Sequence, residues 1–227
     1  MNLFRRVLYN LMTPTYFDID EALRTPQRVK RLYIRFRDDP SKGNLNNYAS
    51  DFLKFVNLQE LRIQLGPNDL PTLPAEIGEL KTLKKLSILN VPFNDFPEWA
   101  TNLVNLEYLM VRGCEITSVP KIMANLKKLE VLRIENCKLA EMPEGINELA
   151  LLKELSFSDT PILFSSIKNL PKSLKILSLV MNENLNNYKS DWDRVYHLFS
   201  NIKIFPDIKQ AEGKKQLLEE LNYFIQS

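Results

Sequence analysis

Leucine-bearing segments recur at a nearly constant spacing, and this repeat limits the possible folds more than any other feature of the chain. The clearest unit begins at Leu106 and reads LEYLMVRGCEITSVPKIMANLKK. The next begins 23 residues later, at Leu129, and reads LEVLRIENCKLAEMPEGINELAL. A period in the twenties is typical of a solenoid, in which each repeat forms one coil that stacks on its neighbours. Units in the same phase start at Val29, Leu58, Leu83, Leu152 and Leu174.

Positions one, four and six of each unit are apolar, as in Leu129, Leu132 and Ile134. Side chains alternate across a strand, so positions four and six face inward while positions three, five and seven face outward. We call the surface formed by those outward positions the concave face. Each coil adds one strand to a parallel sheet. An eighth strand is predicted near the end of the chain, with positions one, four and six at Phe199, Ile202 and Ile204.

The second half of the unit also follows a pattern. LEVLRIENCKLAEMPEGINEL has the form LxxLxLxx(N/C)xLxxLPxxIxxL, with Met142 in the leucine slot before Pro143. LPAEIGELKTLKKLSI and VPKIMANLKKLEVLRI fit the same frame. Over about residues 29–205 the chain therefore resembles the leucine-rich repeat family, in particular its intracellular LPxxIxxL subclass. The resemblance implies an α/β fold: a right-handed solenoid with a curved parallel sheet of about eight coils.

Both ends of a solenoid need covering, because a terminal coil has no neighbour on one side. Residues 1–28 are predicted to form an N-terminal helical cap, in which Asp18 and Glu21 form a capping box for a helix that Pro26 stops. Residues 206–227 carry a helical stripe of apolar residues and are predicted to be a C-terminal capping helix. Docking of a membrane surface or a partner is the alternative role for the first cap, and docking of a partner helix for the second.

Position nine is the place where the resemblance implies a buried residue that bonds the backbone of neighbouring coils. Cys114, Cys137 and Thr160 suit that role, and we expect the two cysteines to be ladder residues rather than a redox pair. A catalytic thiol is disfavoured because the single histidine, His197, lies three coils away. Val91 and Gly66 depart from the pattern, so the first three coils are expected to be irregular. The other residues at position nine are Arg37 and Asn182.

One segment occurs twice, as NLNNYASD at 44–51 and as NLNNYKSD at 184–191. In both copies a serine and an aspartate precede an aromatic-rich stretch, and these residues are good helix N-caps. The sequence predicts helices near 50–57 and 190–199, with only short turns in the middle coils. A duplicated binding loop is the alternative interpretation.

Motifs for chemistry are missing from the sequence, which predicts no catalytic residue, no metal site and no cofactor. Gly-rich phosphate loops and His/Cys clusters with metal spacing do not occur. The chain has 30 basic and 28 acidic residues, a net charge of +2, whereas proteins that coat nucleic acids are more basic. No apolar run reaches the roughly 18 residues of a membrane span, and no secretion signal is predicted. We expect a cytoplasmic, non-enzymatic protein.

Binding is predicted on the concave face, because the residue types at its outward positions differ between the first, central and late coils. Tyrosine, methionine and arginine are enriched at protein interfaces, and they gather in the first and central coils. The late coils carry small serines instead. The predicted function is recognition of another protein, with arginines selecting an acidic partner. The predicted contact residues are Arg31, Tyr33, Arg35, Arg62, Tyr108, Met110, Arg112, Val131, Arg133 and Glu135.

Three alternatives remain open for this face. Its residues could serve only solubility. The arginine band could bind nucleic acid or another polyanion, although the near-neutral net charge weighs against this. The sheet could also self-associate as an architectural subunit. The sequence predicts no particular oligomeric state.

Overall fold

A computed structural model describes residues 13–35, 44–65, 72–179 and 201–205. Several predictions concern segments outside this described part: the start of the N-terminal cap, the second NLNNY copy with its helix, and the C-terminal capping helix. The same holds for Phe199, His197 and three residues at position nine, Arg37, Gly66 and Asn182.

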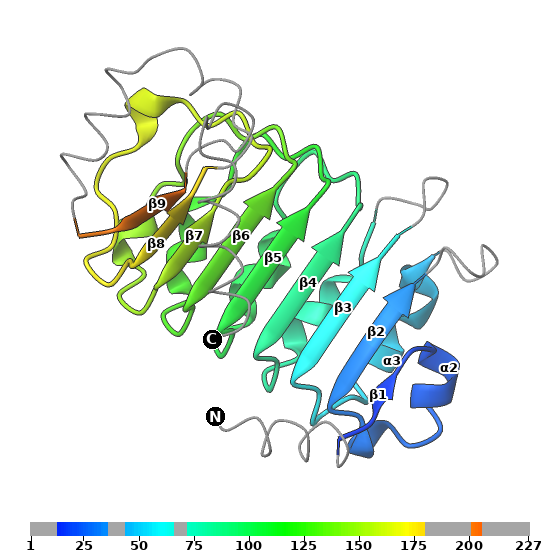
Figure 1. Ribbon diagram of the computed structural model, residues 1–227. Helices are drawn as coiled ribbons and strands as arrows, with labels where there is room; N and C mark the ends of the chain where they lie inside the picture. The colour runs from blue at the N-terminus through cyan, green and yellow to red at the C-terminus, as the bar shows by residue number, and fades with distance from the viewer. Residues whose placement is uncertain (1–12, 36–43, 66–71, 180–200, 206–227) are drawn as a thin grey trace, which may run out of the picture.

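The described residues form one sheet of nine parallel strands that follow one another in chain order (Figure 1). Short helices lie behind the strands, and the opposite side of the sheet is the concave face (Figure 1). The strands are β1 (Thr15–Tyr16), β2 (Arg31–Arg35), β3 (Glu60–Gln64), β4 (Lys85–Leu89), β5 (Tyr108–Arg112), β6 (Val131–Glu135), β7 (Glu154–Ser156), β8 (Ile176–Ser178) and β9 (Lys203–Phe205).

The inward leucines of successive coils lie in register, as the repeat predicts. Leu109 pairs with Leu132, and Leu132 pairs with Leu155. All three side chains are fully buried. Each such leucine contributes about 1.5–3 kcal/mol through removal of apolar surface from water. Because every coil shares this interior with its neighbours, the array is one continuous core rather than a set of independent units.

Short 3₁₀ helices form the second half of the middle coils. Pro74, Pro97 and Pro120 lie in extended backbone directly before η5, η6 and η7. Proline suits this place because it fixes φ and no ladder bond needs its missing N–H. The prediction of short turns in these coils is confirmed. The helices are η5 (Ala75–Glu79), η6 (Glu98–Asn102), η7 (Lys121–Asn125), η8 (Ile146–Glu148) and η9 (Phe164–Ser166).

Each middle strand is followed by one residue in the left-handed region of the backbone. Position eight is Asn90, Gly113, Asn136 and Asp159 in four successive coils, with φ of 58°, 67°, 49° and 53°. Glycine, asparagine and aspartate are the residues that adopt this conformation most readily. The chain therefore leaves the sheet by the same turn in these four coils. At Gly113 a Cβ would also lie 2.5 Å from Asn90 Oδ1, so any larger residue would force the Asn90 side chain to move.

The N-terminal cap combines a helix with an extra strand. Asp18 accepts a hydrogen bond from the Glu21 backbone N–H at 2.8 Å and caps α2 (Ile19–Ala22), which confirms the predicted helix start. Pro26 then begins the 3₁₀ helix η1 (Pro26–Arg28). The cap also contains a strand that was not predicted, since β1 extends the sheet by pairing with β2. A strand of two residues is too short to leave a periodic pattern.

The first NLNNY segment starts its helix earlier than predicted. Asn44, not Ser50 or Asp51, is the cap, and it accepts from the Asn46 N–H at 3.0 Å. The 3₁₀ helix η4 (Leu45–Tyr48) follows, and then α3 (Ala49–Phe52). The predicted extension to residue 57 is wrong. After α3 the backbone bonds reach back three residues, which places Phe52, Phe55 and Leu58 in the core at the three-residue period of a 3₁₀ turn.

The irregularity predicted for the first coils does not extend to their strands, and residues 36–43 and 66–71 of those coils lie outside the described part. Strands β2 to β6 each have five residues in unbroken register, and only β7, β8 and β9 shorten to three. Val91 is fully buried, so its apolar side chain takes the place of a polar ladder residue without disturbing the strand before it. The strand hydrogen bonds belong to the backbone and do not depend on position nine.

The predicted phase of the last strand is also wrong. Ile204, rather than Ile202, pairs with Leu177 and occupies position four. A shift of two residues keeps the same face inward, so Ile204 is still buried.

Position nine forms the predicted ladder between coils. Thr160 Oγ1 donates to the Ile134 carbonyl at 3.1 Å, and Cys137 Sγ donates to the Val111 carbonyl at 3.9 Å. Both cysteines are buried and neither forms a disulfide. A hydrogen bond to Cys137 and burial raise the pKa of the Cys114 thiol, which therefore stays protonated. The cysteines thus serve as donors to the backbone.

Candidate partner-binding surface

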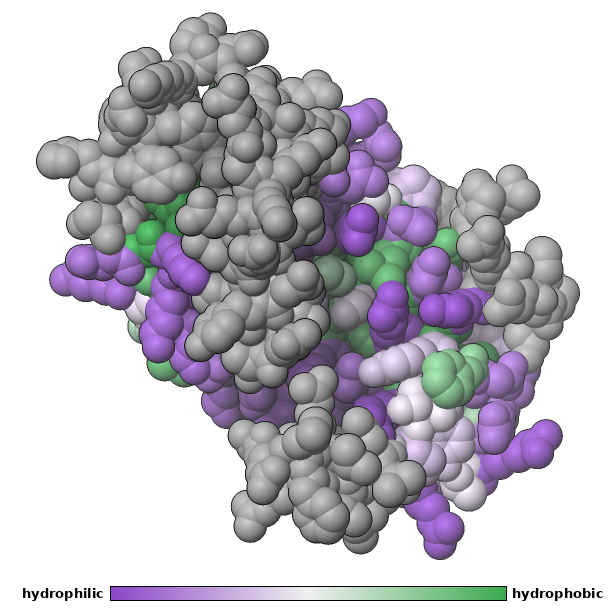
Figure 2. All heavy atoms as spheres, viewed as in Figure 1, coloured by the Kyte–Doolittle hydropathy of each residue, from purple (hydrophilic) through white to green (hydrophobic). Residues whose placement is uncertain are grey.

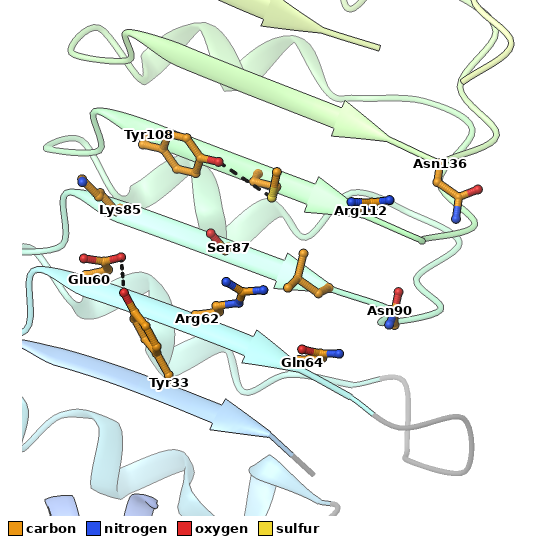
Figure 3. A pocket seen from close by; sticks show the side chains of 12 residues that line it. Tyr33, Glu60, Arg62, Gln64, Lys85, Ser87, Asn90, Tyr108, Arg112 and Asn136 are labelled. Carbon is orange, nitrogen blue, oxygen red and sulfur yellow. Dashed lines mark hydrogen bonds between the residues drawn. The ribbon is translucent and has the colours of Figure 1, made fainter. Parts of the chain in front are cut away.

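A hollow of about 610 Å³ lies on the concave face over β2 to β5. Hydrophilic side chains stand around a more hydrophobic floor in this region (Figure 2). The hollow brings together five of the ten predicted contact residues, namely Tyr33, Arg62, Tyr108, Met110 and Arg112. Its other lining residues are Glu60, Gln64, Lys85, Ser87, Leu89, Asn90 and Asn136 (Figure 3).

Tyr33 forms one wall and is fixed from two sides. Its hydroxyl donates to Glu60 Oε1 at 2.6 Å (Figure 3). The Phe17 ring packs edge-on against it, with ring centroids 5.8 Å apart and planes at 85°. Burial and the hydrogen bond to Glu60 raise the pKa of Tyr33 to about 12. At neutral pH Tyr33 is therefore a protonated donor that occupies the Glu60 carboxylate.

Tyr108 forms the opposite wall. Its hydroxyl lies 3.7 Å from the Met110 sulfur, two residues along the same strand (Figure 3). Burial raises the pKa of Tyr108, with weaker contributions from Glu135 and Glu154. The ring and the thioether together give the hollow an apolar side between its charged groups.

Three cations surround the hollow, one from each of three neighbouring strands. Arg62 lies on β3, Lys85 on β4 and Arg112 on β5, and all three side chains are exposed. Within the part of the chain that the structure describes, none of the three side chains forms an ion pair or a hydrogen bond. Glu60 is the single carboxylate among the lining residues, so the hollow carries an excess of positive charge.

The remaining predicted arginines lie outside the hollow. Arg31 donates to the Thr13 carbonyl and so helps to hold β1 against β2. Arg35, at the end of β2, is exposed. Arg133 forms an ion pair with Glu154 on the adjacent strand. Burial lowers the pKa of Arg133, but the Glu154 charge and Tyr108 outweigh this effect, so the pKa is raised overall. Arg133 is therefore compensated by its own sheet, unlike the three cations of the hollow.

A chain of hydroxyls occupies the concave face beyond the hollow. Ser156 Oγ donates to Glu135 Oε1 at 2.9 Å, and Ser158 bridges to Ser156 and Ser178 at 3.2 Å each. Glu135 is the register partner of Arg112, yet its carboxylate accepts a hydrogen bond from Ser156. Val131 pairs with Tyr108 in the sheet and is half-buried outside the hollow.

Several lining residues were not selected from the sequence. Four of them lie at outward positions three, five or seven, so strand alternation alone predicts that they face the concave side. They are Glu60, Gln64, Lys85 and Ser87. Asn90 and Asn136 lie at position eight, where the left-handed turn brings them to the rim. Leu89 is predicted to face outward, but only 7% of it is exposed, and it lies at the floor of the hollow.

Among the described residues, no three side chains of His, Cys, Asp or Glu gather in a way that could hold a metal ion. In the same residues, no helix has the length and apolar character needed to cross a bilayer.

Comparison with known proteins finds similarity among solved structures. No family model matches the sequence, and no curated protein does. A leucine-rich repeat protein of Leptospira interrogans of known structure superposes with a TM-score of 0.60 and is 29% identical in sequence. The fold is a leucine-rich repeat solenoid. The match covers 75% of this chain, whereas this chain spans only 42% of the Leptospira protein.

Proposed function

We propose that this leucine-rich repeat protein is a non-enzymatic module that recognises another protein through its concave face. The observation that carries the proposal is the hollow over β2 to β5, where tyrosine and methionine walls stand beside exposed cations without partners among the described residues. Tyrosine, methionine and arginine are the side chains that interfaces favour. The similarity to another leucine-rich repeat structure supports a role for the repeat sheet itself.

Rigidity of the face supports binding. Tyr33 is held by Glu60 and Phe17, and each wall belongs to a strand paired on both sides. A preformed surface has little freedom to lose on association, so more of the contact energy remains as affinity.

We further propose that the repeats belong to the intracellular LPxxIxxL subclass and that the protein acts in the cytoplasm. The 3₁₀ helices that follow Pro74, Pro97 and Pro120 fit this subclass. Two buried cysteines without a disulfide suit a reducing compartment. Residues 1–28 and 206–227 are proposed to cap the solenoid of residues 29–205.

Binding of nucleic acid or another polyanion is the second candidate, favoured by Arg62, Lys85 and Arg112. It has less support because Glu135 and Glu154 follow on the next strands, and a long polyanion crossing the sheet would meet them. A salt titration separates the two candidates, since phosphate contacts weaken steeply as salt rises.

The direct test is the double variant Tyr108→Ala/Arg112→Ala. Affinity purification from the native host should recover a partner with the wild type and lose it with the double variant. The Tm should change by no more than a few degrees, because Arg112 is exposed and Tyr108 only half-buried. Lys153→Ala is the control, since Lys153 pairs with Glu130 away from the hollow. Undiminished capture by the double variant would remove the concave face as the binding surface.

A further inference from the structure

On the concave face, hydroxyl groups bind the carboxylates that lie beside the cations of the hollow. Two carboxylates lie next to the cations of the hollow, and each accepts a hydrogen bond from a hydroxyl. Glu60 accepts from Tyr33 at 2.6 Å, and Glu135 accepts from Ser156 at 2.9 Å. Arg112 stands opposite Glu135 in the sheet register but forms no ion pair with it. The cations therefore keep their charge available although acidic neighbours are close.

From this arrangement we infer that the hollow takes an extended acidic segment of a partner protein, with one carboxylate at Arg62 and a second at Arg112. The inference rests on the proposed function and specifies its ligand. Arginine suits this role because its guanidinium binds carboxylates with two parallel hydrogen bonds. Lys85, on the strand between them, adds a third positive charge.

Geometry sets the spacing of the two acidic side chains. Arg62 and Arg112 are separated by two strand spacings, about 10 Å, and by two residues along the strand direction, about 7 Å. Their backbones are therefore about 12 Å apart. An extended chain advances about 3.3 Å per residue, and its side chains on one face recur every second residue. Carboxylates four residues apart, about 13 Å, match both requirements.

A protein segment fits this site better than a nucleic acid. Beyond Arg112 the run of unpaired cations stops, because the face continues with the Arg133–Glu154 pair and a row of serines. A uniform polyanion would leave most of its charges without a cation. The Tyr33 and Tyr108 walls instead offer contact to the side chains between the two carboxylates.

The test uses labelled ten-residue peptides of serine, threonine and valine with glutamates at peptide positions 3 and 7, measured by fluorescence anisotropy on the full chain. Saturable binding is expected, and replacing both glutamates by glutamine should abolish it. Arg62→Gln and Arg112→Gln should each weaken binding by about tenfold, in line with the loss of a hydrogen bond to a charged group. Lys153→Gln removes the same charge outside the hollow and should change the affinity by less than about twofold.

Exchanging the charges of protein and peptide distinguishes a lost contact from a misfolded variant. The double variant Arg62→Glu/Arg112→Glu should lose the glutamate peptide and gain a peptide with lysines at the same positions. A peptide with adjacent glutamates should bind more weakly than the spaced one, because neighbouring side chains of an extended segment point to opposite sides.

Three results would overturn the inference. They are no saturable binding of the glutamate peptide up to about 1 mM, equal binding of the glutamine peptide, or tighter binding of a ten-nucleotide single strand with a steep salt dependence. The proposed function fails separately. If the peptides do not bind but Tyr108→Ala/Arg112→Ala still abolishes partner capture, only the acidic chemistry is wrong.

Discussion

The Tyr33 hydroxyl and the Glu60 carboxylate meet at 2.6 Å across the boundary between β2 and β3. The hydrogen bond does two things at once. It fixes the wall of the hollow, and it holds the one carboxylate among the lining residues away from Arg62, which lies two positions further along the same strand. The first two predictions follow from this pair.

Tyr33→Phe should weaken binding of the glutamate peptide several-fold while costing about 0.5–1.5 kcal/mol of stability, the usual net value of one hydrogen bond. Without the hydroxyl, the Glu60 carboxylate is free to turn toward Arg62 and compete with the ligand. Anisotropy and denaturant unfolding measure the two effects. Tyr108→Phe is the matched control, because among the described residues its hydroxyl meets only the Met110 sulfur, at 3.7 Å. Equal effects of the two variants on peptide binding would contradict the role given to Glu60.

Alkaline titration should reveal Tyr33 as a late-ionising tyrosine. Burial and the Glu60 hydrogen bond raise its pKa to about 12, above the value near 10 in an unfolded chain. The stability that depends on the protonated form is fully present below about pH 10 and is lost as the pH rises through 12. Ultraviolet absorbance of phenolate, recorded after rapid mixing into alkaline buffer, should show a component that titrates near pH 12. That component should disappear in Tyr33→Phe, and its persistence would show that another tyrosine is responsible.

Ser156→Ala should also weaken peptide binding, from the far side of the hollow. Only 3% of Ser156 is exposed, and its hydroxyl holds Glu135 at 2.9 Å. Once released, Glu135 stands opposite Arg112 and can neutralise it. We expect a several-fold loss of affinity that is reversed by adding Glu135→Gln. Ser178→Ala, at the other end of the serine row, should leave the affinity unchanged. Failure of Glu135→Gln to restore binding would mean that Ser156 acts by another route.

Gly113→Ala should destabilise the solenoid by about 1–3 kcal/mol, because alanine is strained at φ of 67° and its Cβ meets Asn90 Oδ1 at 2.5 Å. Chemical denaturation measures the loss. In an Asn90→Gly background the contact disappears and the strain remains, so the same substitution should cost less. An equal cost in both backgrounds would assign the whole effect to backbone strain.

The architecture was predictable because the repeat determines register directly. Leu109, Leu132 and Leu155 occupy one position of a 23-residue period, so their stacking follows from spacing alone. Local geometry that spacing does not encode was missed. The strand β1 has only two residues, too few to show a period. Asn44 caps a 3₁₀ helix, not the longer helix that was predicted.

The candidate site was predictable only in part, for a different reason. Alternation shows which side chains face outward, and five of the ten chosen residues line the hollow. It does not show how those side chains pair with one another. Arg112 and Arg133 look equivalent in the sequence, yet within the described part of the chain Arg112 is exposed without an ion pair and Arg133 is bound to Glu154. That difference depends on which hydroxyl holds which carboxylate on the neighbouring strand.

The common left-handed turn at Asn90, Gly113, Asn136 and Asp159 makes the array modular. A duplicated copy of residues 83–105 inserted after Asn105 would begin and end in the same backbone conformation as its neighbours. It would move Arg112 one strand spacing, about 4.8 Å, further from Arg62. Each added unit of this kind would lengthen the gap between Arg62 and Arg112 that a ligand must bridge, and would place a further copy of Lys85 between them.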